Sequence, residues 1–368
     1  MNLSKIKTYA VFALASALLV MSCKKDEEDD AGEEMVVYDP TPYVLNYPAH
    51  IPPPSIPEDN QLTVQGVRLG KMLFHEPLLS ADGSQSCASC HDQTNAFSDT
   101  AQFSIGVNGL PGGRQAMAVM NMAWNTNGFF WDGRAPLLRD QSLLPIQDEL
   151  EMDETLENVI SKLSNSQAYK DQFTRAFGDS EINALRMSLA MEQFMNSIVS
   201  FDSKYDRYLA GIEQLTESEE RGRQLYFTEF NPFFPDESGA DCEHCHGGGN
   251  FENDEYMNNG LDAEGEFEDD GFYDVTGNEA DRGKFKVTSL RNIALTPPYM
   301  HDGRFNTLEE VIEHYNEGIQ SSASLDPALE ATIETGLMLD DQDIQDLVAF
   351  LHTLTDINFT ENPEYQAP

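Results

Sequence analysis

Two copies of the pentad Cys-x-x-Cys-His occur in the chain, at Cys87–His91 and at Cys242–His246. This pentad is the sequence signature for covalent attachment of a c-type haem: the two thiols bond to the haem vinyl groups, and the adjacent histidine ligates the iron. A zinc ribbon would pair its Cys-x-x-Cys units about 15–20 residues apart, and a thioredoxin-like redox site needs no histidine. The sequence therefore predicts two haem c groups, attached to Cys87, Cys90, Cys242 and Cys245 and ligated by His91 and His246.

The composition is that of an acidic globular protein. The chain has 368 residues, of which 64 are acidic and 22 are lysine or arginine, so its formal net charge is −42. This length is enough for two domains, and a hydrophobic fraction of 40% suits packed cores. The negative charge excludes nucleic acid bound through its phosphates. It favours a basic protein partner, although solubility alone would also explain it.

The N-terminus has the pattern of an exported lipoprotein. An apolar run at residues 9–20 is too short to cross a membrane as a helix. Residues 20–23 read Val-Met-Ser-Cys and resemble a bacterial lipobox. We predict a signal peptide at residues 1–22 and a lipid on Cys23, which would be the only contact with the membrane. The predicted location is the cell envelope, in the periplasm or at the outer membrane. The alternative to a lipoprotein signal is an ordinary secretion signal followed by a chance cysteine.

The remainder divides into a tether and two predicted domains. Residues 23–57 are first acidic and then proline-rich, which predicts an extended tether without a core of its own. We place an N-terminal domain at residues 58–210 and a C-terminal domain at residues 211–360, so that each contains one pentad.

Helices are the regular structure that the sequence predicts. Apolar residues recur at helical spacing between residues 182 and 201 and between residues 344 and 354. Thr307 and Glu310 form a capping box, and the apolar face behind it includes Tyr315. No stretch alternates as a half-buried strand would. The predicted fold is mainly α, with two tandem cytochrome c-like domains, each holding one covalent haem, and with long loops.

Further motifs accompany the pentads. They are Leu69–Phe74, Leu79–Ser80, Phe130–Ala135, Gln141, Pro145, Glu151, Met152, Leu290–Asn292, Thr296–Gly303 and Asp346–Leu351. In this order the motifs resemble the bacterial di-haem cytochrome c peroxidase family, which includes the MauG-type enzymes. The resemblance implies that the N-terminal haem is the peroxide site and the C-terminal haem is the electron store. Because members of that family often form homodimers, a homodimer is one arrangement to expect.

Three residues near the first site take roles from this resemblance. Glu151 would be the acid–base group that moves a proton from one peroxide oxygen to the other, which makes water the leaving group. Gln141 would hydrogen-bond the same oxygen, and Trp131 would pass electrons between the haems. The residues alone leave other roles open: a surface glutamate, a helix-surface amide and a packed core side chain.

One departure from the family pattern lies in the loop after the first pentad. Many members have a histidine there that closes the resting N-terminal iron, and the position is Val107 in this chain. We therefore expect a five-coordinate iron that is open to peroxide. A ligand from Met117, Met120 or Met122 is the alternative.

A second departure concerns the C-terminal haem. Where many peroxidases of the family have a methionine ligand, this chain has Tyr315, as the MauG-type enzymes do. A phenolate ligand would lower the reduction potential of the iron relative to a thioether. Core packing of Tyr315 is one alternative, and Met300 or Met338 as the ligand in its place is another.

The resemblance also implies a calcium ion between the domains. The carbonyl groups of Thr296 and Pro298 match two of its ligands, and Gln115 stands where the family has an asparagine. Oxygen ligands of this kind suit calcium.

Three functions follow as hypotheses. The first is a peroxidase that reduces hydrogen peroxide to water, with electrons entering at the C-terminal haem from a small cytochrome c or copper protein and crossing by Trp131. The second is a MauG-like oxidase that oxidises aromatic residues of a partner protein. The third is a non-enzymatic electron carrier, which would give Glu151 no role.

Overall fold

The computed structural model describes residues 36–368. The predicted signal peptide, Cys23 and the first part of the tether lie outside the described residues. Within residues 36–368, none of the helices combines the length and the apolar character that a membrane crossing requires.

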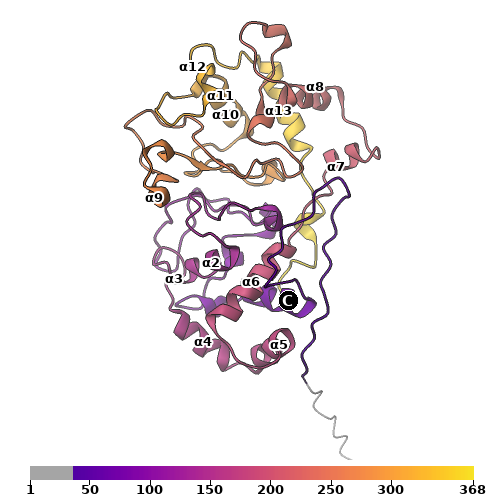
Figure 1. Cartoon of the computed structure of the whole chain (residues 1–368), viewed down its shortest axis with the longest axis vertical. Coiled ribbons are helices and arrows are strands. Elements are labelled where there is room, and N and C mark those ends of the chain that lie inside the picture. The colour runs from indigo at the N-terminus through magenta and orange to yellow at the C-terminus, as the bar shows by residue number, and fades with distance from the viewer. Residues whose placement is uncertain (1–35) are drawn as a thin grey trace, which may run out of the picture. The chain divides into compact units, whose positions relative to one another are not determined.

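Helices supply nearly all the regular structure of the described residues (Figure 1). They are α1 (Val64–Phe74), α2 (Leu138–Gln141), α3 (Leu144–Gln147), α4 (Leu156–Ser164), α5 (Gln167–Phe177), α6 (Ala184–Ser197), α7 (Lys204–Leu209), α8 (Glu217–Phe227), α9 (Tyr273–Thr276), α10 (Leu308–Glu313), α11 (Pro327–Glu330), α12 (Thr332–Thr335) and α13 (Asp341–His352). Two short strands, β1 (Tyr256–Met257) and β2 (Phe285–Lys286), pair antiparallel. The mainly helical character that the sequence predicts is confirmed.

Local sequence signals explain where the predicted helices begin. The two periodic segments form α6 and α13, and the side chain of Asp340 caps the first turn of α13. The capping box of Thr307 and Glu310 is present at the start of α10, with both reciprocal hydrogen bonds. α10 continues into a π-helical turn, His314–Gly318, which contains Tyr315. Such turns often occur at functional sites.

The described part of the tether contains no helix. The amide of Ser55 donates to the carbonyl oxygen of Ala123 at 2.7 Å, and the indole of Trp124 donates to that of Pro52 at 2.7 Å. Ile51 is buried and packs against Gly249, just after the second pentad. The tether therefore contacts the segments that follow both pentads.

The buried apolar residues form two cores. The first lies mostly within residues 62–198, and the second lies within residues 205–354. Phe359 and Tyr365, near the C-terminus, return to the first core. The cores follow the predicted boundary near residue 210, and the division into two domains stays a prediction.

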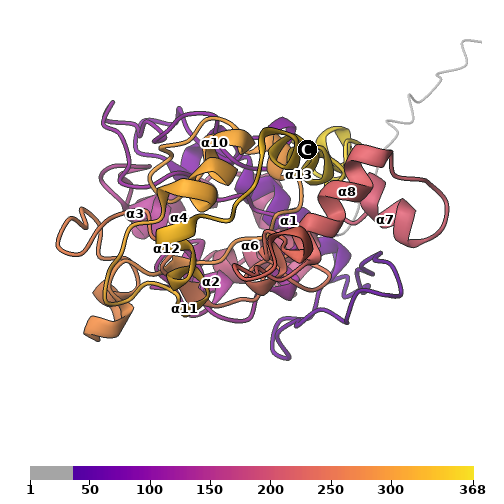
Figure 2. The same ribbon diagram turned by 90° about the horizontal axis from the view of Figure 1, so that it is seen from above.

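Each core contains a pair of helices that approach closely at a glycine. α1 packs on α6 and α8 packs on α13, and Figure 2 shows both pairs. A Cβ atom on Gly70 of α1 would lie 1.9 Å from the carbonyl oxygen of Ala190. One on Gly222 of α8 would lie 1.8 Å from that of Asp346. Only glycine permits these contacts, so in each core a glycine allows the two helices to pack closely.

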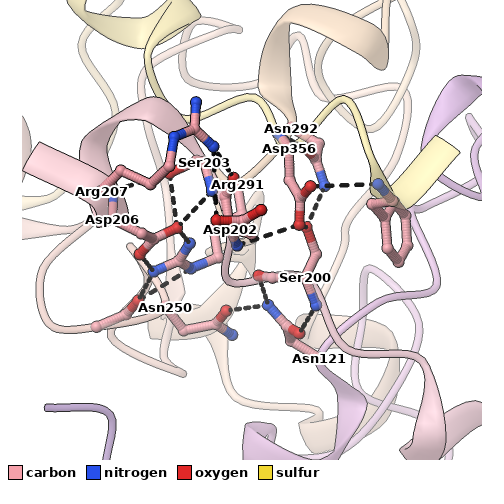
Figure 3. A network of polar contacts seen from close by, with 12 residues as sticks. Asn121, Ser200, Asp202, Ser203, Asp206, Arg207, Asn250, Arg291, Asn292 and Asp356 are labelled. Carbon is pink, nitrogen blue, oxygen red and sulfur yellow. Dashed lines mark hydrogen bonds and ion pairs between the residues drawn. The ribbon is translucent and has the colours of Figure 1, made fainter. Parts of the chain in front are cut away.

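A buried ion pair forms one side of the polar network in Figure 3. Arg291 donates to both carboxylate oxygens of Asp206, at 2.8 and 2.9 Å. The side chains are 2% and 4% exposed. Burial alone would raise the pKa of Asp206, but the hydrogen bonds and charge of Arg291 outweigh it and hold the pKa below its ordinary value. Arg291 follows the second pentad and Asp206 lies in α7, so the pair fixes that segment against the helix.

The same network reaches the segment that follows the first pentad. The amide of Asn121 donates to the carbonyl oxygen of Ser200 and to the side-chain oxygen of Asn250. The hydroxyl of Ser200 accepts from the amide of Asn292 and donates to Asp356. The buried amide and hydroxyl groups of this network therefore have hydrogen-bond partners (Figure 3). A buried network of this kind favours one defined arrangement of the segments around the two pentads.

Candidate active site

Both pentads adopt the same local conformation. A 3₁₀ turn begins each of them, at Cys87–Ser89 and at Cys242–His244. The amide of the histidine then donates to the carbonyl oxygen of the first cysteine, at 2.9 Å in both pentads. The histidine is thus held one turn after the first thiol, which is the arrangement that joint attachment to one haem requires.

One cavity of about 750 Å³ is lined by both pentads. The four pentad cysteines are free thiols, and burial raises the pKa values of Cys87, Cys242 and Cys245 to about 12. Buried thiols that keep their protons are poor thiolate ligands for a metal. Among residues 36–368, no group of three His, Cys, Asp or Glu side chains could hold a metal ion by itself. These observations fit thiols that become thioethers rather than a zinc site.

The proximal histidines are oriented by backbone carbonyl groups. Nδ1 of His91 lies 3.0 Å from the oxygen of Phe97, and Nδ1 of His246 lies 3.0 Å from that of Thr288. A carbonyl oxygen only accepts, so Nδ1 carries the proton and the Nε2 lone pair is available to a metal. Burial lowers both pKa values, that of His246 to about 4, so the rings are neutral. The residues present therefore fit two haem c groups. Sequence analysis missed Phe97 and Thr288 because a backbone carbonyl leaves no residue-type signal.

Glu151 lines the cavity together with the first pentad and Gln141. It lies in the turn between α3 and α4, where its amide donates to the carbonyl oxygen of Asp148. Burial and, to a lesser extent, the charge of Asp148 raise the pKa of Glu151 to about 6, against the opposing charge of Arg134. The side chain is not the exposed surface glutamate of the alternative interpretation. A carboxyl with this pKa exchanges protons near neutral pH, as general acid–base work requires.

Trp131 lies in the wall of the same cavity, at a junction of distant segments. Its indole donates to the carbonyl oxygen of Gln115 at 2.8 Å. Its own carbonyl oxygen accepts from the amide of Lys286 at 2.8 Å, on β2. Trp131 therefore contacts segments from both predicted domains, which suits a relay between two haems as well as packing.

Tyr315 also lines the cavity, so the structure brings it into the site. Its hydroxyl oxygen lies 3.2 Å from the amide nitrogen of Asn259, and the same nitrogen lies 3.4 Å from the sulfur of Met300. Met338 is 40% exposed and is not among the lining residues, so the alternative that it ligates iron is wrong. Tyr315 and Met300 remain. No motif in the sequence marks Asn259, which lies in a loop.

The three methionines considered for the first iron all lie near the cavity. Met117, Met120 and Met122 are among the lining residues. The sulfur of Met120 accepts from the amide of Asn292 at 3.1 Å. Val107 is not a lining residue, and its amide donates to the carbonyl oxygen of Glu151 at 2.8 Å.

The predicted calcium ligands lie on this cavity too. Gln115, Thr296 and Pro298 are all lining residues. The amide nitrogen of the Gln115 side chain donates to the hydroxyl of Ser98 and to the carbonyl oxygen of Asp99. The structure brings the three together, and calcium binding stays a prediction.

Comparison with known proteins identifies relatives over most of the chain. Residues 64–214 match the family model described as di-haem cytochrome c peroxidase. A methylamine utilization protein MauG from Methylophilus methylotrophus is 33% identical over 82% of this chain and 86% of its own. A cytochrome c551 peroxidase from Nitrosomonas europaea is 34% identical over 82% of this chain and 81% of its own. A solved structure of a MauG-like protein associated with microbial copper homeostasis has a TM-score of 0.78, at 35% identity, over 89% of this chain and 99% of that one.

Proposed function

Because the chain belongs to the di-haem cytochrome c peroxidase family, we propose that it reduces hydrogen peroxide to water with two covalently attached haem c groups. The reaction combines peroxide with two electrons and two protons to give two water molecules. The observation that carries the proposal is Glu151, a cavity-lining carboxyl with a pKa raised to about 6 beside the first pentad. The relatives include both peroxidases and MauG proteins, so the proposal chooses between two chemistries within one family.

The residues of the chain would bind the haems and move the proton. Cys87 and Cys90 would hold one haem and His91 its iron, and the second pentad would do the same for the other. When bound, the haems would pass on the electrons of the donor and supply the iron at which peroxide reacts. Glu151 would take a proton from one peroxide oxygen and return it to the other, and Gln141 would orient the same oxygen.

Electrons would enter at the second pentad and cross by Trp131. No lysine or arginine stands between Arg223 and Arg282, the segment that contains this pentad. The local charge therefore favours a basic donor protein, such as a small cytochrome c or a copper protein with a basic face.

The proposed function is tested with the haem-loaded protein, a reduced basic cytochrome c as donor, and hydrogen peroxide. We expect oxidation of the donor that depends on both peroxide and the protein and that stops when peroxide is exhausted. A protein that consumes no peroxide with any reduced donor, protein or small molecule, would contradict the proposal.

The pH dependence of peroxide reduction follows from the pKa of Glu151. The ionised carboxylate is the base, and burial raises its pKa to about 6. The second-order rate constant for peroxide should therefore fall as the pH drops below about 6, because the carboxyl is then protonated. This is measured by stopped-flow kinetics across the pH range. An acidic limb that survives unchanged in Glu151→Gln would assign it to another group.

A MauG-like oxidation of a partner protein is the second candidate, and Tyr315 favours it. The phenol lines the cavity beside Met300, and burial raises its pKa. Only displacement of its proton by iron would make it a phenolate ligand. The MauG relatives make this chemistry relevant to the chain.

Replacing Tyr315 by methionine should raise the reduction potential of the second haem, because a thioether stabilises ferrous iron more than a phenolate does. The change should fall within the range of about 0.8 V that axial ligands span. It is measured by spectroelectrochemical titration, with Tyr273→Met, outside the cavity lining, as the matched control. Equal potentials in the variant and the wild type would show that Tyr315 is a packing residue.

We further propose that the unit is held in the cell envelope by a lipid on Cys23, with the acidic and proline-rich tether between lipid and enzyme. The two-domain division near residue 210, calcium at Gln115, Thr296 and Pro298, and a homodimer belong to the same proposal. The contacts of Ile51 and Pro52 with the folded unit support a tether that ends against both pentad segments.

A further inference from the structure

The loop at residues 104–112 forms a small finger beside the first pentad. Ile105 and Pro111 pair as an isolated antiparallel bridge, and the amide of Gly112 donates to the carbonyl oxygen of Ser104 at 2.9 Å. The side chain of Gln85, two residues before the pentad, donates to the carbonyl oxygen of Ile105 at 2.8 Å. The base of the finger is thus fixed to the segment that holds the first haem site.

The tip of this finger is bonded to the turn that contains Glu151. The amide of Val107 donates to the carbonyl oxygen of Glu151 at 2.8 Å. The backbone of Gly106 approaches so closely that an added Cβ atom would lie 2.1 Å from the carbonyl oxygen of Leu150. Only glycine fits at residue 106, because any other side chain would push the finger away from the turn.

Asn108 adds two contacts on either side of Glu151. Its amide nitrogen lies 3.1 Å from the carbonyl oxygen of Glu149 and 2.9 Å from a carboxylate oxygen of Asp153. Asp153 has a positive φ of 45°, which is costly for a residue other than glycine unless contacts hold it there. One exposed side chain therefore joins both ends of the five-residue turn.

The carboxyl group of Glu151 has no such support of its own. Within residues 36–368, no side-chain hydrogen bond holds it, and its position depends on the backbone of the turn. Within the turn, the amides of Glu151 and Asp153 both donate to the carbonyl oxygen of Asp148. The finger adds further contacts between this turn and the haem site, beside the one that the amide of Ala81 makes with the carbonyl oxygen of Met152 at 2.9 Å.

We propose that Asn108 is a positioning residue, which clamps the turn at residues 149–153 so that Glu151 is aimed into the cavity before peroxide arrives. The inference rests on the proposed function, because it acts through the acid–base role of Glu151. In many family members this loop contains the histidine that closes the iron. In this chain, the loop would instead hold the acid–base group in place.

The test compares Asn108→Ala and Asn108→Asp, which both remove the donor, with Asn165→Ala. Asn165 is a matched control, because its exposed amide also donates to a backbone carbonyl, at the C-terminal end of α4 and away from the Glu151 turn. We expect the rate constant for peroxide to fall about ten- to hundredfold in both Asn108 variants, since small misplacements of a catalytic group have effects of this order. The melting temperature and the spectrum of the ferric haems should stay as in the wild type.

A double-mutant cycle with Glu151→Gln separates positioning from general damage. If Asn108 acts through Glu151, adding Asn108→Ala to Glu151→Gln should cause no further loss. An equal loss in both backgrounds, or no loss from Asn108→Ala alone, would overturn the inference while leaving the acid–base role intact. Full activity of Glu151→Gln would instead overturn the proposed acid–base role, and the inference with it.

Discussion

Replacing Glu151 by glutamine should lower the rate constant for peroxide reduction by a factor on the order of 10²–10⁴, the contribution that a positioned acid–base group makes. Glutamine has nearly the same shape and fills the same place in the cavity wall. It cannot accept and return the proton, so the loss would be chemical rather than structural. The measurement is single-turnover stopped-flow kinetics with the haem-loaded protein under excess peroxide.

Glu149→Gln is the matched control for this prediction. Glu149 is two residues away in the same turn, but its side chain is exposed and is not among the lining residues of the cavity. The same chemical change there should leave the rate constant as in the wild type. Comparable losses in both variants would point to the net charge of the turn, and wild-type kinetics in Glu151→Gln would remove the residue from the mechanism.

Replacing Asp206 by alanine should lower the free energy of unfolding by about 3–5 kcal/mol, the cost of leaving the partner of a buried ion pair uncompensated. Arg291 would keep its charge with 2% of its side chain exposed and would lose two short hydrogen bonds. The loss should appear as a lower midpoint of urea unfolding, followed by fluorescence. The contact of Arg291 with the carbonyl oxygen of Gly249, close to the second pentad, should weaken at the same time.

Asp179→Ala is a suitable comparison, because Asp179 binds Arg186 through two bonds of similar length but is 60% exposed. Its removal should have a much smaller effect, as is usual for surface ion pairs. The Asp206 effect also has a defined pH window. The folded pKa of Asp206 lies below the ordinary value near 4, so its stabilisation is present above that value and is lost as the pH falls through the folded pKa. A loss at neutral pH no larger than that of Asp179→Ala would show that Arg291 finds other partners.

The sequence predicts those features that depend on short-range patterns. Cys87–His91 and Cys242–His246 form the same turn, and α10 begins at its predicted capping box, because these structures involve residues only a few positions apart. Tyr315 falls on the cavity side because it continues the apolar face of α10. Glu151 required the family resemblance, since its spacing alone does not distinguish it from the neighbouring acidic residues.

The features that the sequence does not reveal depend on partners far apart along the chain. Asn259 meets Tyr315 from a loop without regular structure, and Asp206 meets Arg291 across 85 positions. Backbone carbonyl groups that orient the proximal histidines have no residue-type signal at all. The exclusion of Met338 likewise needed the tertiary structure, because only the folded chain shows that this side chain is outside the cavity.

The most direct test of the account is to mix the fully oxidised, haem-loaded protein with stoichiometric hydrogen peroxide and to follow the Soret band by stopped flow. Val107 stands in place of a closing histidine and Glu151 is already in the cavity wall, so the first site should be assembled and open in the resting protein. We expect a fast spectral change without prior reduction, and a much slower one in Glu151→Gln. A change that occurs only after one-electron reduction would contradict the open site, and no change in either state would contradict an enzymatic role and leave an electron carrier.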